Sequence, residues 1–470
     1  MQRRFDAIII GSGVGGAGVA ALLAHAGWKV AVLERNELLG GRCITYERSG
    51  CAIDLGWHFY CLGEKGPLQE IAIRVGAPRI PWNNVGSRSF LQIGDVVKKY
   101  SKAAMFEAVP PAERAGFERL FQYVFETPDA ELERLWYVPV WEWVDRFTKD
   151  RMAHTIIESF VSQYFCVPST VASTAEFIRA FRDVMSKRAT AYPSGGNASV
   201  PGAYLAAVEK HGGEIRTRAE VARILVNGGA AVGVVLSDGT ELRAPVIVSN
   251  ADLRATVLKL AGPEHFPEDY VKRVQSLTYS IPGVMLRVLV SEKVTDKQVV
   301  IYIPDERSAP LDVTPEMWRG EVPELVAGCF GSPTNFDPSM APDGKQLLTS
   351  LHGCPPDMAA RADEWREALL RSCFRVFPEA RGKVEKVWFD TPALVNGFAG
   401  EDGAIIGVGQ TVDQVHERRP SVVSPVKGLY FASGEAGGHG IGTELAASSA
   451  LQLFEVLRGR RPDAATARAA

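Results

Sequence analysis

The chain has 470 residues, of which 46% are apolar, and its formal net charge is −3. This length predicts two or three domains with a sizeable buried core, whereas the near-neutral charge without a basic run argues against nucleic acid as a partner. Seven scattered cysteines without the spacing of a zinc site predict a reducing cytoplasm and no metal, and no stretch is apolar for long enough to span a bilayer.

The first sixty residues begin with a strand, a glycine turn, a helix and a second strand. The apolar run 5–10 predicts the strand, 19–26 the helix and 29–33 the second strand, which ends in Glu34. This order predicts a dinucleotide site, with Glu34 accepting the ribose hydroxyls and disfavouring NADP through repulsion of its 2′-phosphate. The residues expected to hold the cofactor here are Gly11, Gly13, Val14, Gly15, Gly16, Glu34 and Arg35.

A second motif follows at Leu38-Leu39-Gly40-Gly41-Arg42-Cys43, and a third at 50–58, which ends in Gly56-Trp57-His58. An arginine after two glycines can place its guanidinium on a pyrophosphate; the alternative is a surface loop. These residues resemble the extended fingerprint of FAD enzymes related to amine oxidases and phytoene desaturases. The resemblance implies that Gly41 and Arg42 bind the cofactor diphosphate and that Gly56, Trp57 and His58 lie near the flavin.

Residues 63–191 change to a helical period and are rich in aromatic side chains. They predict a helical insertion suited to a long apolar substrate. The segment 136–144, Trp-Tyr-Val-Pro-Val-Trp-Glu-Trp-Val, predicts an interfacial patch, with burial in the core as the alternative. The scattered cysteines predict a cytoplasmic protein. Because of this aromatic segment, peripheral contact with the inner face of the membrane is left open.

The middle of the chain predicts strands and few helices. Helix 200–210 and strands 220–226, 231–236 and 246–249 predict a β-meander on the nucleotide domain, and the resemblance implies that the backbone of Val221 faces the adenine. Strands 283–290, 299–303, 325–330 and 346–351 with a helix over 358–377 predict a mixed sheet. His352 and Cys354 are expected in a loop after the last of these strands.

The last hundred residues resemble the C-terminal FAD motif of the phytoene desaturase group. The resemblance implies that Gly434 and Glu435 lie at the ribityl chain or a phosphate-bound water. The glycine-rich start of a helix near 443–457, with Gly442 and Thr443, is expected to donate N–H groups to the flavin ring. His439 and His58 are the candidate catalytic residues, because histidine can move a proton near neutral pH; the alternative is a structural hydrogen bond.

Together these features predict an α/β fold. A Rossmann-type FAD-binding domain with a β-meander is expected from 1–62, 192–278 and 390–458, and a mixed α+β substrate domain from 279–389 with the helical insertion 63–191; 459–470 is expected to be a flexible tail. The predicted function is an oxidoreductase with noncovalent FAD, because neither Cys nor His beside Glu435 is placed for a covalent link.

Its substrate is expected to be lipophilic and unsaturated, of carotenoid or isoprenoid type. Hydride transfer at flavin N5 would desaturate, saturate or isomerise this substrate, with a quinone or oxygen as the electron acceptor. The alternatives are an amine oxidase, a protoporphyrinogen oxidase-type enzyme, and a prenyl-binding escort-like protein that is not an enzyme.

Overall fold

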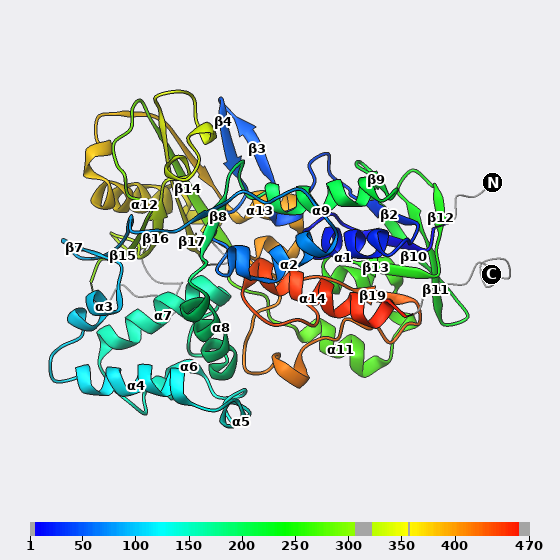
Figure 1. Cartoon of the computed structure of the whole chain (residues 1–470), viewed down its shortest axis with the longest axis horizontal. Coiled ribbons are helices and arrows are strands. Elements are labelled where there is room, and N and C mark those ends of the chain that lie inside the picture. Colours follow the sequence, from blue (N-terminus) through cyan, green and yellow to red (C-terminus); the bar gives the residue numbers. More distant parts are fainter. Residues whose placement is uncertain (1–4, 306–321, 356–357, 460–470) are drawn as a thin grey trace.

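The computed structural model describes residues 5–305, 322–355 and 358–459. Figure 1 shows a parallel sheet with its helices on the right, a second sheet at the upper left and a group of helices below it. The order of the elements along the chain passes back and forth between these parts, so each part is built from segments that are far apart in the sequence.

The first sheet has five parallel strands in the order β19-β13-β1-β2-β9. Its central strands are short, apolar and buried along their whole length, as is typical of a parallel sheet covered on both faces. The sheet unites the three segments predicted for the nucleotide domain. Its strands are β1 (Ala7–Ile10), β2 (Val30–Leu33), β9 (Glu214–Arg216), β13 (Val246–Ser249) and β19 (Leu429–Phe431).

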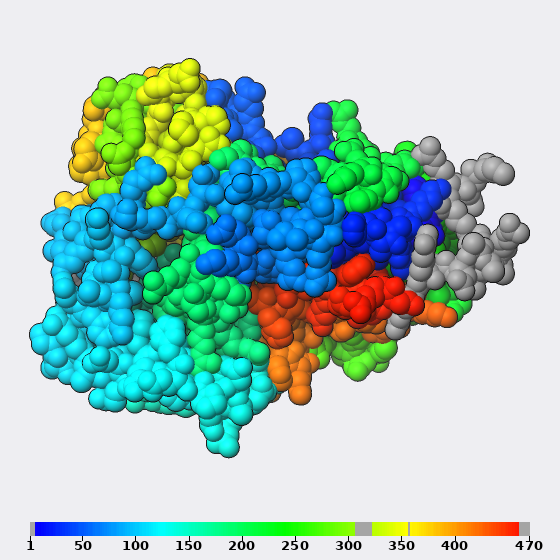
Figure 2. All heavy atoms as spheres, viewed as in Figure 1, coloured from blue at the N-terminus to red at the C-terminus, as the bar shows by residue number. Residues whose placement is uncertain are grey.

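Alternate residues of these strands enter two different cores. Ile9 and Val32 lie in a cluster with α1 (Val14–His25), α2 (Pro67–Arg74), α9 (Ser199–Lys210) and α14 (Gly442–Leu457). Ile8 and Leu33 point the other way, into a cluster with the β-meander and α11 (Glu268–Ser276). Figure 2 shows α2 in blue beside α14 in red on one face of the molecule, so two segments that are far apart in the sequence pack together.

The meander consists of β10 (Val221–Asn227), β11 (Ala230–Leu236) and β12 (Glu241–Arg243). The prediction that 246–249 is its third strand was wrong, because these residues form β13 of the parallel sheet. All four residues of β13 are buried, as a strand covered on both faces requires, whereas β12 is only partly buried.

The second sheet has seven strands in the order β18-β14-β17-β16-β15-β6-β7. Two of its strands, β6 and β7, come from the insertion that was predicted to be helical; β6 pairs with β15 in parallel. The expected strand 325–330 is shorter and shifted, and the expected helix 358–377 is a 3₁₀ turn, Met358–Arg361, followed by α12. The elements are β6 (Ser89–Ile93), β7 (Val96–Lys99), β14 (Gly283–Val290), β15 (Val299–Ile303), β16 (Gly328–Gly331), β17 (Gln346–Gly353), β18 (Val384–Asp390) and α12 (Ala362–Val376).

One face of the second sheet packs on α12, and the other faces the helices of the insertion. Val300 and Tyr302 belong to the core beneath α12, whereas Val299 and Ile301 belong to the core of the insertion. His352 lies within β17 and is buried, so its expected position in a loop was wrong. Cys354 follows the strand in a loop, as expected, but is buried and not at the surface.

The insertion packs its aromatic side chains inward. Trp136 and Trp143 are each 1% exposed, and of the segment 136–144 only Tyr137 and Glu142 are exposed. Of the two alternatives for this segment, burial in the core describes Trp136 and Trp143, which pack among short helices; contact with a membrane stays a prediction. These helices are α3 (Lys102–Ala108), α4 (Arg114–Glu126), α5 (Asp129–Leu132), α6 (Val140–Val144), α7 (Arg151–Phe165) and α8 (Thr174–Lys187).

The remaining elements are short: β3 (Thr45–Arg48), β4 (Cys51–Asp54), β5 (Trp82–Asn84), β8 (Ala191–Pro193), α10 (Leu253–Ala255) and α13 (Pro392–Ala399). Of the predicted tail 459–470, all but Gly459 lies outside the described residues. Within the described part of the chain, every helix is too short or too polar to traverse a bilayer.

Candidate functional site

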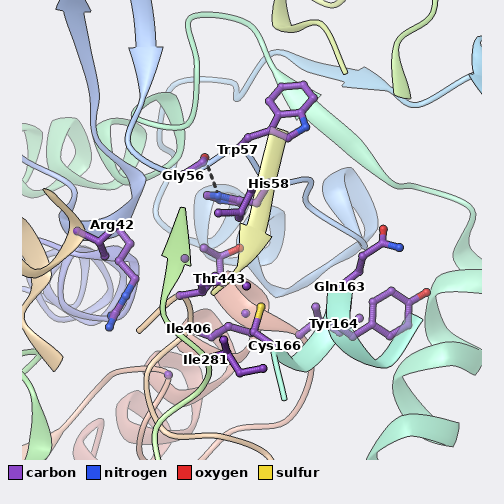
Figure 3. A pocket seen from close by; sticks show the side chains of 18 of the residues that line it. Arg42, Gly56, Trp57, His58, Gln163, Tyr164, Cys166, Ile281, Ile406 and Thr443 are labelled. Carbon is purple, nitrogen blue, oxygen red and sulfur yellow. Dashed lines mark hydrogen bonds between the residues drawn. The ribbon is translucent and has the colours of Figure 1, made fainter. Parts of the chain in front are cut away.

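A cavity of about 2080 Å³ extends from the glycine turn of the parallel sheet to the helices of the insertion. Typical ligand pockets measure roughly 300–1,000 Å³, so this cavity has room for a dinucleotide and for a second large ligand. In Figure 3, Arg42 stands on the left, Gln163 and Tyr164 on the right, and His58 and Thr443 between them.

Most of the residues predicted from the sequence meet at this cavity. Gly16 does not line the cavity. A Cβ at this position would lie 2.3 Å from the carbonyl oxygen of Gly11, so glycine here allows the helix to pack closely against the turn. The predicted residues that line the cavity are Gly11, Gly13, Val14, Gly15, Glu34, Arg35, Gly41, Arg42, Gly56, Trp57, His58, Val221, Gly434, Glu435, Gly442 and Thr443.

The glycine turn presents the start of α1 to the cavity. Gly11 has φ +92°, which favours glycine, and Gly13 is the N-cap residue of α1. No described side chain caps this helix, so its first N–H groups are available to an anion. The turn therefore suits a phosphate group.

Glu34 is 5% exposed and holds the turn in place from the end of β2. Its Oε2 accepts hydrogen bonds from the backbone N–H of Ser12 at 3.0 Å and from its hydroxyl at 2.7 Å, and its Oε1 accepts one from the N–H of Asn36 at 2.9 Å. Arg35 donates to the carbonyl of Phe398 at 2.9 Å and so connects this corner to α13. Glu34 thus organises the site and also borders the cavity.

Arg42 stands among carboxylates at the cavity wall. Its guanidinium forms an ion pair with Glu401 and donates from Nε to the carbonyl of Ala404 at 3.1 Å. Burial lowers the pKa of Arg42, but the charges of Glu401 and Glu435 outweigh this and raise it. Arg42 therefore remains a cation that can bind a diphosphate.

Glu435 is 2% exposed and accepts a hydrogen bond from the N–H of Leu253 at 2.6 Å. Burial, followed by the neighbouring carboxylates Glu401 and Asp252, raises the pKa of Glu435 well above its usual range. Asp252 accepts a hydrogen bond from the hydroxyl of Tyr279 at 2.5 Å. The raised pKa of Glu435 favours the neutral form of this carboxyl group, which lowers the repulsion between the cavity wall and an anionic ligand.

His58 faces the cavity as a neutral side chain. Its Nδ1 lies 3.1 Å from the carbonyl oxygen of Gly56 and 3.3 Å from Nδ2 of Asn197. Burial lowers the pKa of His58 to about 4. The neighbouring ring of Trp57 packs against the ring of Phe59, with the two ring centroids 4.8 Å apart. His58 is thus positioned by its contacts with Gly56 and Asn197, and Trp57 by its contact with Phe59.

His439 does not lie at the cavity. Its side chain is 62% exposed, and its Nδ1 is 3.7 Å from Oε2 of Glu176. The sequence placed it correctly in the glycine-rich loop before α14 but could not show that its side chain points away from the cavity. This position does not support the catalytic role predicted for His439 and favours the alternative of a structural contact.

The apolar end of the cavity has walls from the insertion and the second sheet. Tyr164 and Cys166 come from the end of α7, and Ile281 and Ile406 lie close to Thr443 in Figure 3. The lining includes acids that the sequence did not assign to the site, among them Asp252, Glu401 and Glu444. The turn after β13 and the 398–407 motif indicated the first two regions, whereas Glu444 looked like an ordinary residue in the first turn of a helix.

The parallel sheet, the glycine turn, the acid at the end of the second strand and the adjoining cavity define the dinucleotide-binding flavoprotein class. Residues 18–452 match the family described as flavin containing amine oxidoreductase, and the chain belongs to this family. It is therefore a flavin-dependent oxidoreductase, as the sequence predicted.

Similar proteins agree with this family. The prolycopene isomerase of Arabidopsis thaliana is 25% identical over 460 residues, which cover 86% of this chain and 74% of that protein. An inactive all-trans-retinol 13,14-reductase of Danio rerio is 29% identical over 305 residues, but the alignment covers 55% of this chain and about half, 49%, of that protein. The crystal structure of an oxidoreductase from Methanosarcina mazei has the same fold, with a TM-score of 0.77, 20% identity and coverage of 96% and 99%.

Proposed function

We propose that the protein binds FAD without a covalent bond and uses it to desaturate, saturate or isomerise a C–C bond of a lipophilic, unsaturated substrate. The observation that carries this proposal is the single cavity that joins the glycine turn to the apolar end between α7 and the second sheet. Such a cavity brings a nucleotide cofactor and a long apolar molecule into contact away from bulk water.

The residues at the cavity fit FAD in chemistry and in order. The free N–H groups at the start of α1 and the cation Arg42 would hold the diphosphate, and Glu34 would accept the ribose hydroxyls. Gly442 and Thr443 would stand at the flavin ring, where the start of α14 favours negative charge. Bound FAD would supply hydride transfer at N5.

Noncovalent attachment is supported by the state of the cysteines at the cavity. Burial raises the pKa of Cys43, Cys166 and Cys329 to about 12 in each case. These side chains remain thiols, which are poor nucleophiles for attachment to a flavin.

The apolar residues at this end of the cavity would orient the substrate and exclude water. Tyr164, Cys166, Ile281 and Ile406 offer no charge to a polyene, and neutral His58 offers a hydrogen bond but no cation. The similarity to a prolycopene isomerase supports a polyene as substrate. Oxidation of an amine is the alternative that the family description supports.

The test begins with the absorption spectrum of the purified protein, before and after reconstitution with FAD or FMN. Release of the flavin by acid precipitation would confirm noncovalent attachment, and a flavin band that stays with the precipitate would contradict it. The protein with oxidised flavin is then mixed anaerobically with phytoene, prolycopene, all-trans-retinol and benzylamine. In a second experiment the flavin is first reduced with dithionite, and the reduced protein is mixed with the same polyenes, with benzoquinone and with oxygen. Flavin bleaching or reoxidation by a polyene supports the proposal, whereas bleaching by the amine alone overturns it.

A further inference from the structure

Glu444 is a carboxylic acid in an otherwise uncharged part of the cavity wall. It is the third residue of α14, is 1% exposed and lines the cavity between Thr443 and Cys61. Its Oε1 accepts a hydrogen bond from the backbone N–H of Leu62 at 3.0 Å, and Thr443 Oγ1 donates to its Oε2 at 3.3 Å. Within the described part of the chain, neither Lys, Arg nor His forms an ion pair with it.

The titratable groups around Glu444 are neutral near pH 7 and do not compensate the charge of its carboxylate. The titratable side chains that sense it are Cys43 of the loop after β2, Tyr60 and Cys61 of the loop after β4, and Tyr204 of α9. Burial raises the pKa of each of them, so all four stay neutral near pH 7. Burial also raises the pKa of Glu444 itself, to about 7.

This position differs from that of the acids in the cofactor motifs. Asp252, Glu401 and Glu435 form one group beside Arg42, and Glu34 accepts hydrogen bonds from the glycine turn. Glu444 instead stands next to Thr443, which lies between His58 and Ile406 in Figure 3. The Thr443 hydroxyl can both donate and accept, so it can carry a proton between the carboxyl group and the cavity.

We propose that the Glu444 carboxyl group, through the Thr443 hydroxyl, exchanges the proton that accompanies hydride transfer at the substrate C–C bond. This inference rests on the function proposed above. In the desaturating direction, the carboxylate would take H⁺ from one carbon of the substrate, and bound oxidised FAD would supply the acceptor for H⁻ from the neighbouring carbon. A C=C bond would form, with the substrate oxidised by two electrons and the cofactor reduced by two. In the saturating direction the carboxyl group would return H⁺ to the substrate, which would receive H⁻ from the reduced cofactor.

The test compares Glu444→Gln with wild type, using prolycopene and all-trans-retinol as substrates. Glutamine keeps an oxygen for the Leu62 N–H but cannot exchange a proton. We expect unchanged FAD retention, at least tenfold slower turnover, and loss of the transition near pH 7 from the pH profile. Infrared difference spectra of the flavin-free protein between pH 5 and pH 9 should lose one carboxylic-acid band in the variant.

Glu176→Gln is the matched control. Glu176 is likewise the third residue of a helix, is 4% exposed and accepts a backbone N–H, that of Gly440 at 3.1 Å, but it does not line the cavity. Its variant should keep the wild-type turnover and the transition near pH 7. If Glu444→Gln fails to fold, Glu444→Asp replaces it, since that variant keeps a titrating acid with a shorter reach and should show slower turnover with a shifted transition.

Equal turnover and an equal pH profile for wild type and Glu444→Gln would overturn the proposal, and so would an infrared titration that the variant does not change. Both results leave the proposed function intact, because wild type still reacts. A wild-type protein that retains no flavin, or that reacts with no polyene, would instead refute the proposed function itself.

Discussion

The raised pKa of Glu444 predicts that this residue makes the stability of the protein depend on pH. Its pKa moves from an ordinary value of 4.5 to about 7 in the folded protein. The folded state therefore holds a proton that the unfolded chain has already released, and stability falls as the pH rises from 4.5 to 7. Each unit of difference between the pKa values of the folded and unfolded states corresponds to about 1.4 kcal/mol, so the free energy of unfolding falls by about 3 kcal/mol in total.

Glu444→Gln removes this dependence, because glutamine does not titrate. Relative to wild type, the free energy of unfolding of the variant should rise by about 3 kcal/mol between pH 4.5 and pH 7 and then remain level above pH 8. Urea unfolding of the flavin-free proteins at intervals from pH 4.5 to 8.5 measures this difference. Glu209→Gln, on the exposed face of α9, removes a carboxylate without burial and should show none of it.

A difference between Glu444→Gln and wild type that stays constant over this range would refute the reasoning. It would mean that the carboxyl group is ionised in the folded protein despite its burial. A rise of the same size in Glu209→Gln would equally refute it, because the effect would then belong to net charge and not to Glu444.

The remaining predictions concern the cofactor. Gly13→Val should abolish FAD retention on gel filtration, because a Cβ at Gly13 would lie 2.6 Å from Oδ1 of Asn250. The control Gly202→Ala, which has open space around its Cβ, should retain FAD. A Gly13→Val protein that is still fully yellow would contradict the proposed cofactor site. Glu34→Ala should weaken FAD binding by about 1–3 kcal/mol in a fluorescence titration, and unchanged affinity would remove its ribose role. Arg42→Gln should weaken FAD binding at low salt more than at high salt, since a screened cation contributes less; equal losses would argue against contact with the diphosphate.

The sequence predicted the cofactor corner well because its signals are local. A buried strand, a glycine turn and an acid at a fixed distance depend on neighbours within about thirty residues, and β1, α1 and β2 appear where the pattern placed them. The predicted residues for the diphosphate, including Arg42, then meet at one cavity.

Features that depend on distant neighbours were harder to predict. Trp136 and Trp143 have the composition of a membrane interface, but their burial is decided by helices that close around them. His439 shared the glycine-rich loop with residues of the cavity, yet backbone direction turned its side chain to solvent. Glu444 escaped notice for the opposite reason, since only the approach of Leu62, almost four hundred residues earlier in the chain, encloses it.

The five-stranded sheet has a consequence for synthesis of the protein. β1 pairs with β13, about 240 residues later, and β13 pairs with β19, about 180 residues later still. In a nascent chain, one side of β13 therefore stays unpaired until β19 leaves the ribosome. Contacts of such long separation form slowly and expose strand edges to aggregation, so this protein should depend strongly on chaperones during translation.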